Sequence, residues 1–438
     1  MSTVFDAVYI TALAFCSPYF FLKFITSKRY RSGLSQRLGW INIKKNKKPC
    51  VWIHCASVGE VLMIKSLVKS IGKEFNYLNI IVSTNTNTGL SVAERYFDSR
   101  NIFYFPLDLS WIAEKALGTI QPCCIILIEL EIWPNFLIVA AKRRIPVILL
   151  NARISERSLK WYRAASKLSK GFFESLTSKE NVFCARTGTD ATRLMNLGIS
   201  RTQVLITGNM KFDNILTDVP EDVKKRLSDL FEINKDDIVI VCGSTHEGEE
   251  VILLKIFRQV KEKLKQVRLV LAPRHIERTP DLSKLIESAG LRWIRKTSLD
   301  GGNKIGEQKY ETIILVDTVG ELLTTYSIAD CVFVGKSLVP QGGQNMLEPA
   351  GLAKPIIVGP HTFNFHEEVQ LLKEADAIEI IQDESALLNK MMYLLEHPDK
   401  AREMGKRAQS VVIKQKGATD RNVKVLKKIL LKERAVLV

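Results

Sequence analysis

The sequence predicts an α/β protein with two doubly wound parallel sheets and an additional N-terminal membrane-anchor helix. Two series of short apolar runs, each typical of buried strands, alternate with helical patterns, and such alternation favours parallel sheets. A charged, proline-containing segment, Thr217–Asp229, separates the two series and predicts a domain junction. With 438 residues, 46% of them hydrophobic and 25% charged, the chain has room for two or three globular domains with substantial cores.

The individual strands follow from the apolar runs in chain order. The first series comprises Val51–His54, Ile80–Ser83, Ile125–Ile128, Val147–Leu150 and Val204–Ile206, with helical patterns such as Leu90–Phe97 and Leu159–Leu168 between several of them. The second series comprises Ile238–Cys242, Arg268–Ala272, Thr312–Val316, Cys331–Val334 and Pro355–Val358, and a lysine-rich amphipathic helix is expected around Leu426–Leu431. We expect Rossmann-like domains over residues 28–215 and 216–438, facing a cleft as in the glycosyltransferase B (GT-B) architecture.

The N-terminal region combines an apolar stretch with a basic one. Ala7–Leu22 carries no charge but contains Pro18, and its sixteen residues fall short of the ~20 that a straight spanning helix needs. Residues 1–27 are therefore expected to anchor the protein, either spanning the membrane or lying in its interface. Nine basic residues follow without an acid: Lys23, Lys28, Arg29, Arg31, Arg37, Lys44, Lys45, Lys47 and Lys48.

This basic segment predicts the partner and the location. Positive charge beside an apolar anchor places the rest of the chain in the cytoplasm and attracts anionic lipids. A nucleic-acid partner would also suit a net charge of +16, but the excess clusters beside the anchor and no nucleic-acid motif is present. The eight cysteines form no C-x-x-C pair, which favours reduced thiols over a disulfide framework or a zinc site. Neither H-E-x-x-H nor D-x-D occurs, so no metal is expected.

A glycine-containing loop in residues 332–350 suggests a nucleotide site. An apolar strand ends at Gly335, the pair Gly342 and Gly343 follows, and Asn345 precedes Glu348 at the start of a helical segment. Glycines allow close approach to a ligand, and a helix N-terminus attracts phosphate. A carboxylate such as Glu348 can accept from ribose hydroxyls. The alternative is an ordinary tight strand–helix connection, since short glycine motifs are weak signals.

Glu60 is the candidate general base. The segment VWIHCASVGE at 51–60 passes from a strand to a helical pattern, which places Glu60 at the carboxyl edge of a sheet, where α/β proteins bind ligands. A carboxylate there can take the proton of a sugar hydroxyl as it attacks. The alternative is an acidic residue that only stabilises the helix N-terminus.

Three further residues are candidates for the reaction. Glu129 and Glu131 stand two residues apart on an apparently extended segment, which would point both side chains to one face. One of them could instead be a structural partner for Arg153 or another arginine, and paired carboxylates also occur in hydrolases. Lys211 follows the strand Val204–Ile206 and could stabilise developing charge, although a solvated surface lysine is the simpler alternative.

Without a metal, protein groups must neutralise a departing phosphate. Ser244 and Thr245 are expected to open a helix after Ile238–Cys242, and Arg274 and His275 follow the next strand. An arginine fork matches phosphate geometry. An Arg-His pair is otherwise a common surface feature.

Seven motifs in one order resemble the 3-deoxy-D-manno-octulosonic acid (Kdo) transferase family, glycosyltransferase family 30. They are HCASVGE, ELEIWPN (129–135), NARIS (151–155), GNMKFD (208–213), GSTHEGEE (243–250), APRHIER (272–278) and QGGQNMLEPA. The resemblance implies an inverting transfer of Kdo from CMP-Kdo to a lipid A precursor (lipid IVA), without a cofactor or metal, in lipopolysaccharide core biosynthesis at the cytoplasmic face of the bacterial inner membrane. It also implies that the first domain binds the acceptor and the second binds CMP-Kdo.

The resemblance also assigns residues. It implies that Glu60 is the catalytic base, that Glu131 supports the transition state or the acceptor geometry, and that Lys211 stabilises charge. The implied CMP-binding residues are Ser244, Thr245, Pro273, Arg274, His275, Val319, Gly320, Glu321, Asn345, Met346, Leu347 and Glu348. Two positions depart from the family pattern, because Lys336 stands where the family has glycine and Gln344 where it has histidine.

Three alternatives to this function remain. A UDP-sugar glycosyltransferase would share the architecture and differ in its donor. A sugar-nucleotide epimerase would share it too, but would need neither an anchor nor a basic segment. A non-catalytic membrane-binding module would leave the site-like motifs unused.

Overall fold

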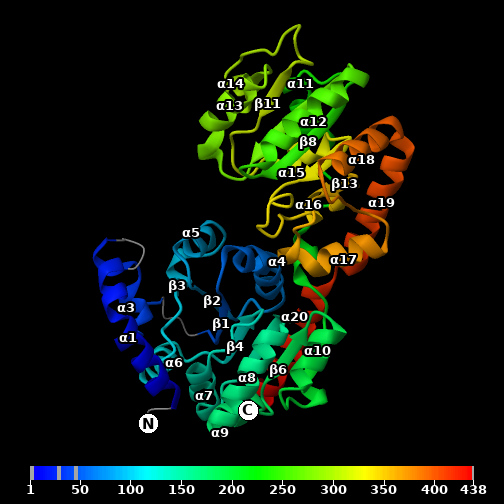
Figure 1. Ribbon diagram of the computed structural model, residues 1–438. Helices are drawn as coiled ribbons and strands as arrows, with labels where there is room; N and C mark the ends of the chain where they lie inside the picture. Colours follow the sequence, from blue (N-terminus) through cyan, green and yellow to red (C-terminus); the bar gives the residue numbers. More distant parts are fainter. Residues whose placement is uncertain (1–3, 27–30, 44–47, 437–438) are drawn as a thin grey trace. The chain divides into compact units, whose positions relative to one another are not determined.

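The computed structural model describes residues 4–26, 31–43 and 48–436, and they divide into two compact units (Figure 1). Unit 1 contains the chain up to Asn214 and again from Lys416 onward. Unit 2 contains Ile215–Gln415. Each unit is built around its own seven-stranded sheet.

The sheet of unit 1 has the strand order β3-β2-β1-β4-β5-β6-β7, and all its neighbouring strands are parallel. Its strands are β1 (Cys50–Cys55), β2 (Asn79–Thr84), β3 (Ile102–Tyr104), β4 (Cys124–Ile128), β5 (Val147–Ala152), β6 (Val182–Ala185) and β7 (Val204–Ile206). Its helices are α1 (Val4–Thr26), α3 (Leu34–Arg37), α4 (Val58–Glu74), α5 (Asn87–Tyr96), α6 (Ser110–Ile120), α7 (Pro134–Lys142), α8 (Glu156–Leu168), α9 (Lys170–Leu176), α10 (Gly188–Met195) and α20 (Ala418–Val436), with short 3₁₀ turns at Ser99–Asn101, Arg201–Gln203 and Met210–Asn214.

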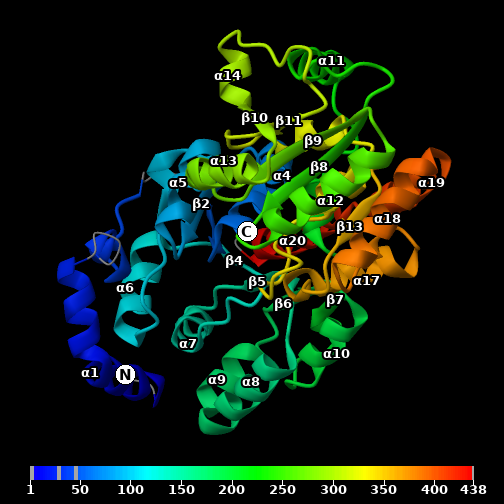
Figure 2. The same ribbon diagram turned by 45° about the horizontal axis from the view of Figure 1, so that its top comes forward.

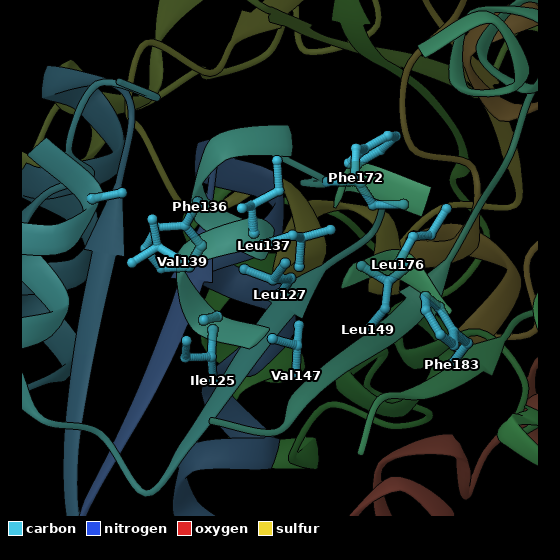
Figure 3. Packing of buried hydrophobic residues seen from close by; sticks show 14 of the residues in the cluster. Ile125, Leu127, Phe136, Leu137, Val139, Val147, Leu149, Phe172, Leu176 and Phe183 are labelled. Carbon is cyan, nitrogen blue, oxygen red and sulfur yellow. The ribbon is translucent and has the colours of Figure 1, made fainter. Parts of the chain in front are cut away.

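Helices cover both faces of this sheet, so its central strands are largely apolar, and the polar side chains in them, such as His54 and Ser83, are buried. Trp52 of β1 points to the face covered by α6 to α10, whereas its neighbours Val51 and Ile53 point to the face covered by α4 and α20. Figure 3 shows the first of these cores, in which residues of α7 such as Phe136 and Leu137 lie over the side chains of β4 and β5. Burial on both faces fixes the strand register, because a slip of one residue would exchange the two side-chain sets.

The sheet of unit 2 has the order β10-β11-β9-β8-β12-β13-β14, again with parallel neighbours. Its strands are β8 (Ile238–Thr245), β9 (Val267–Pro273), β10 (Arg292–Arg295), β11 (Thr312–Leu315), β12 (Cys331–Val334), β13 (Ile356–Val358) and β14 (Glu379–Ile380). Its helices are α11 (Glu221–Leu230), α12 (Glu249–Lys263), α13 (Thr279–Ser288), α14 (Lys296–Asp300), α15 (Leu322–Ser327), α16 (Leu347–Gly351), α17 (His366–Glu374), α18 (Glu384–Glu396) and α19 (Pro398–Gln415), with 3₁₀ turns at Ile276–Arg278 and Phe363–Phe365. One face of the sheet packs against α12, α13, α18 and α19.

The predicted fold class of two parallel-sheet α/β domains is confirmed, and each of the ten predicted strands coincides with an observed one. Four strands were missing from the prediction: β3, β6, β10 and β14. Three of these, β3, β10 and β14, form sheet edges. The four missed strands have two to four residues each, and apolar runs this short cannot be assigned to a strand by periodicity alone.

The prediction that residues 416–438 belong to the second domain is wrong. Figure 1 shows α20, drawn in red, among the elements of unit 1, and Figure 2 shows the helix from a second direction. Leu426 of α20 lies in the same buried cluster as Ile64 of α4. Asp213 fixes the beginning of the helix by accepting from the backbone N–H groups of Gly417 (2.6 Å) and Thr419 (2.5 Å). An amphipathic pattern predicts a buried face, but it does not say which sheet buries that face.

The expected anchor forms α1, whose first turn belongs to the core of unit 1. The ring of Phe5 meets the ring of Phe172 edge to face at 5.6 Å. The buried Asp6 carboxylate accepts from the Ser110 N–H (2.8 Å) and from the Asn135 side chain (3.1 Å). Among the described residues, no helix has the length and apolar character needed to cross a membrane.

The basic segment is described only in part. Lys28, Arg29, Lys44, Lys45 and Lys47 lie outside the described residues. Two of the others are bound to unit 1 itself. The Arg37 side chain donates to the Asn85 carbonyl (2.7 Å) and lies over the Tyr104 ring, and the Lys48 ammonium donates to the Asn76 carbonyl (2.7 Å).

The role of Asp213 can be tested by replacing it with alanine. The variant leaves two N–H groups at the start of α20 without their acceptor, so we expect the free energy for opening α20 to fall by about 1–2 kcal/mol. Hydrogen exchange of peptides from α20 measures this quantity. Asp222→Ala on α11, which removes an exposed ion pair with Arg226, is the control and should leave α20 exchange unchanged. Equal protection of α20 in the two variants would contradict the assignment.

Candidate functional site

Chain order defines a ligand site at one edge of each sheet. In unit 1 the chain builds β1, β2 and β3 outward in one direction and then β4 to β7 in the other, so β1 and β4 flank the point of reversal. In unit 2 the corresponding pair is β8 and β12. Loops that leave such a pair diverge to opposite faces and open a crevice at the carboxyl ends of the strands. The predicted site residues lie at or after the ends of β1, β4 and β7 in unit 1, and of β8, β9, β11 and β12 in unit 2.

Glu60 lies in the first turn of α4, directly after β1, and it is buried. Its carboxylate accepts from the Ala56 N–H (2.8 Å) and from the Ser57 hydroxyl (2.9 Å), while Ser57 is the N-cap of the helix. The structure therefore shows that Glu60 stabilises the helix start, and its role as the base stays a prediction.

The electrostatic surroundings keep Glu60 titratable near neutral pH. Burial raises the pKa of Glu60 to about 7, and the negative charges of Glu129 and Glu131 add to that rise. The hydrogen bonds from Ala56 and Ser57 act in the opposite direction. A carboxylate with a pKa near the working pH is both available as the free base and basic enough to take a proton.

The segment with Glu129 and Glu131 is a turn and is not extended, so the predicted same-face geometry is wrong. Glu129 has a φ of +58° just after β4 ends, which redirects the chain before α7. The Glu129 carboxylate lies 3.8 Å from the Lys211 ammonium, which comes from the 3₁₀ turn after β7. The structure thus places the predicted Lys211 beside Glu129.

Glu131 is held by a histidine that the prediction did not single out. The His54 Nε2 lies 3.2 Å from Glu131 Oε2, and the Trp133 indole N–H donates to the same oxygen at 2.9 Å. Neither carboxylate pairs with Arg153 within the described part of the chain, so that alternative is wrong. A signal for His54 was present in the sequence, because a histidine in the middle of the apolar run 50–55 needs a buried polar partner.

In unit 2, a buried carboxylate shapes the loop after β12. Glu249 accepts four backbone N–H bonds, from Lys336 (2.7 Å), Ser337 (2.8 Å), Leu338 (2.9 Å) and His246 (2.9 Å). It therefore joins the loop after β12 to the loop after β8. The neighbouring Glu250 pairs with Arg278 at 2.9 Å, which connects the GSTHEGEE and APRHIER motifs.

Ser244 and Thr245 do not open a helix, contrary to the prediction. They are the last residues of β8, and α12 begins only at Glu249. Ser244 has a φ of +55°, a left-handed conformation that turns the strand end. The Thr245 hydroxyl is buried without a hydrogen-bond partner among the described residues. A ligand group in this place would satisfy it.

Pro273 ends β9, and Arg274 and His275 follow as exposed side chains. The Arg274 N–H donates to the Thr245 carbonyl (3.0 Å), so the ends of β8 and β9 are fixed to each other. The rings of His275 and His246 meet edge to face at 5.6 Å. Burial is the main cause that lowers the pKa of His246, and the charge of Lys336 lowers it further.

The segment 345–348 forms a rigid turn before α16. The Asn345 side chain donates to Glu348 Oε1 (3.1 Å) and accepts from the Leu347 N–H (3.1 Å), while Met346 and Leu347 are buried. Burial raises the pKa of Glu348, whereas the bond from Asn345 and the charge of Arg274 oppose that rise. The charge of Arg274, which follows β9, therefore acts on Glu348, which follows β12.

Val319, Gly320 and Glu321 lie in the loop after β11. Glu321 is an ion-pair partner of Lys296 (2.7 Å) and also accepts from the Thr318 hydroxyl. Gly320 has a φ of +93°, and Val319 is 80% exposed. Glu321 therefore already has an ion-pair partner and a hydrogen-bond donor. The Arg274 side chain, in contrast, makes no hydrogen bond or ion pair among the described residues.

Lys336, where the family pattern has glycine, has a φ of +61°. This is the left-handed region that glycine occupies without steric cost. Within the described residues, no group of three or more His, Cys, Asp or Glu side chains is arranged to hold a metal ion. Each of the eight cysteines is a thiol and not half of a disulfide.

Comparisons with known proteins point to one family. The family model described as 3-deoxy-D-manno-octulosonic-acid transferase (kdotransferase) matches residues 32–214. The 3-deoxy-D-manno-octulosonic acid transferase of Haemophilus influenzae is 32% identical over 430 residues, which cover 96% of this chain and 98% of that protein. A bifunctional glycosyltransferase/methyltransferase of Fusobacterium nucleatum is 35% identical over 317 residues, covering 72% of this chain and 48% of its own length.

A solved structure shares the fold over most of the chain. The UDP-GlcNAc 2-epimerase from Neisseria meningitidis, bound to UDP-GlcNAc, has a TM-score of 0.58 and 16% identity, with coverage of 87% of this chain and 100% of that one. At this identity the likeness shows the GT-B-like fold alone. Identity and coverage with the Haemophilus protein decide the family, so this chain belongs to the 3-deoxy-D-manno-octulosonic acid transferase family and is a glycosyltransferase.

Proposed function

We propose that this chain transfers Kdo from CMP-Kdo to a lipid A precursor such as lipid IVA, with inversion at the anomeric carbon. The observation that carries the proposal is the carboxylate group after β1 and β4: a buried Glu60 with a pKa raised to about 7, near Glu129 and Glu131. A base poised in this way suits attack by a sugar hydroxyl, which is a poor nucleophile while it keeps its proton.

The chemistry is a single displacement. Glu60 takes the proton of the acceptor hydroxyl while the hydroxyl oxygen forms its bond to the anomeric carbon of Kdo. The bond from that carbon to the phosphate oxygen breaks, and CMP leaves with the electron pair. One displacement inverts the configuration. Glu131 orients the acceptor, and the Lys211 ammonium, 3.8 Å from Glu129, stabilises the negative charge that develops.

We assign acceptor binding to unit 1 and CMP-Kdo binding to unit 2. The support in unit 2 is the set of groups at the carboxyl ends of its central strands. The exposed Arg274 suits a phosphate, and the unpartnered Thr245 hydroxyl suits a further polar group of the donor. Glu348, oriented by Asn345, suits the ribose hydroxyls. These groups can neutralise the departing CMP without a metal.

We also propose that α1 holds the enzyme at the cytoplasmic face of the inner membrane. Beyond its docked first turn, the helix exposes large apolar side chains, namely Val8, Ile10, Leu13 and Phe15, and Phe15 is 89% exposed. Large apolar side chains exposed on more than one side of a helix favour insertion into the interfacial region of a bilayer. A lipid-linked acceptor would then be reached at the membrane surface.

The base is tested by Glu60→Gln, which keeps an acceptor oxygen for the helix start but cannot take a proton. We expect transfer from CMP-Kdo to tetraacylated lipid A precursor, followed by mass spectrometry of the lipid, to slow by about 10²–10⁴-fold. In the parent enzyme kcat/KM should fall as the pH drops through about 7, because protonation removes the base. Glu94→Gln on the exposed face of α5 is the control. Near-parental turnover in Glu60→Gln would refute the assignment.

The donor site is tested by Arg274→Ala. Loss of a charged hydrogen bond to phosphate should raise the KM for CMP-Kdo by about 10–100-fold. Arg258→Ala, an exposed arginine on α12, is the matched control and should leave this KM unchanged. Transfer should also persist in excess chelator. Loss of activity in chelator, restored by a divalent ion, would show that the phosphate is not neutralised by protein groups alone.

The membrane role is tested with single substitutions in α1, since a deletion of residues 1–22 would also remove the buried Phe5 and Asp6 from unit 1. Leu13→Ser and Phe15→Ser should each weaken binding to anionic lipid vesicles by roughly 10-fold, because each removes a large apolar group from the bilayer interface. Co-sedimentation measures the affinity. Val251→Ser, an exposed apolar residue of α12, serves as the control. Equal affinity of all three variants and the parent would exclude α1 as the membrane contact.

A further inference from the structure

A chain of hydrogen bonds runs through the core of unit 1 to Glu131. The Trp52 indole N–H donates to the Ser83 hydroxyl oxygen (2.7 Å), and His54 Nδ1 lies 3.0 Å from the same oxygen. His54 Nε2 lies 3.2 Å from Glu131 Oε2. Trp52, His54 and Ser83 are fully buried, and His54 pairs with Ser83 in the register of β1 and β2.

The acceptor at the end of the chain sets its direction. The Glu131 carboxylate oxygen can only accept, so His54 Nε2 carries a proton and donates it to Glu131. His54 Nδ1 lies 3.0 Å from the Ser83 hydroxyl oxygen and 3.2 Å from the Ser83 carbonyl oxygen. The Ser83 hydroxyl accepts from the Trp52 indole, so it keeps its own proton and can donate it to Nδ1 of the neutral ring.

The contacts of Glu131 are concentrated on one of its two oxygens. Oε2 receives both His54 Nε2 and the Trp133 indole N–H, which donates at 2.9 Å. Among the described residues, Oε1 has no hydrogen-bond partner, and the side chain is 18% exposed. Two donors on one oxygen fix the plane of the carboxylate and leave Oε1 available for a ligand.

His54 itself cannot move to a substrate. Its ring stacks on Phe105 with centroids 3.8 Å apart and an interplanar angle of 23°, and it is fully buried. Partners of this kind, which orient a functional ligand without touching the substrate, are common behind metal and catalytic sites.

We propose that His54 is a positioning residue for the transfer reaction: its Nε2–H, directed by Ser83 and Trp52, locks Glu131 so that Oε1 receives a hydroxyl of the acceptor sugar. This inference rests on the proposed function, because it gives Glu131 its acceptor-orienting role. It adds a residue whose contribution is made through Glu131 and not through the substrate.

Two substitutions separate positioning from packing. The amide of His54→Gln can reach the position of Nε2 and donate to Glu131, whereas the shorter amide of His54→Asn reaches only the position of Nδ1. We expect His54→Asn to lower kcat by about 10–100-fold while the KM for CMP-Kdo stays within about threefold, since a misplaced group costs turnover rather than donor binding. His54→Gln should restore most of this loss. Thermal unfolding of both variants reports whether they fold equally well.

A double substitution tests the coupling to Glu131. If His54 acts through Glu131, adding His54→Asn to Glu131→Gln should cost little beyond the loss caused by Glu131→Gln alone. Independent, multiplicative losses would overturn the proposal. The proposal would also be overturned if His54→Asn and His54→Gln lost equal activity and if that loss followed their thermal stability.

A readout that does not depend on activity distinguishes this proposal from the proposed function. The ¹⁵N chemical shifts of the His54 ring in the parent protein report which nitrogen carries the proton, and we expect Nε2. A proton on Nδ1 alone would overturn the proposal even in an enzyme that transfers Kdo. A protein with the Nε2–H tautomer that did not transfer Kdo would refute the proposed function and leave the hydrogen-bond chain standing.

Discussion

The parallel alignment of the strands is the constraint on which the sites depend. Because neighbouring strands run in one direction, all of their carboxyl ends meet at a single edge of each sheet. Residues distant in sequence, such as Glu60, Glu131 and Lys211, therefore come together after β1, β4 and β7. Burial at this edge is the main cause of the raised pKa of Glu60, and the charges of Glu129 and Glu131 add to it. The parallel topology thus brings the candidate residues together and also buries Glu60, which raises its pKa.

In unit 2, the buried Glu249 has no ion-pair partner among the residues that the structure describes. The Glu249 carboxylate is surrounded by four backbone N–H groups, whose dipoles stabilise its charge and which would otherwise lack acceptors in a tight loop. This arrangement explains Gly335, since a Cβ there would lie 2.8 Å from Glu249 Oε2 and 2.5 Å from the Ser244 carbonyl oxygen. Glu249 thus joins two motifs that are about ninety residues apart in the sequence.

Sequence patterns predicted what depends on local periodicity. The central strands were confirmed because burial on both faces makes them continuously apolar, and Glu60 was placed correctly at a strand–helix junction. The errors concern features set by tertiary contacts. The turn at Glu129 and the strand-like Ser244 depend on left-handed backbone conformations that single residues adopt without a sequence pattern. The role of His54 depends on Glu131, seventy-seven residues away.

The C-terminal helix α20 belongs to unit 1, and this affects how the chain folds while it is being synthesised. Unit 2 is encoded entirely within the interval between the two parts of unit 1, so it can be completed on the ribosome while unit 1 still lacks a helix. Until α20 emerges, the surface of β1, β4 and α4 that it covers exposes apolar side chains such as Ile53, Ile64 and Ile126. Exposed apolar surface of this kind attracts chaperones and promotes aggregation. Synthesis of unit 1 begins first, but its last helix is made after unit 2. Unit 1 is therefore the later of the two units to reach its final state.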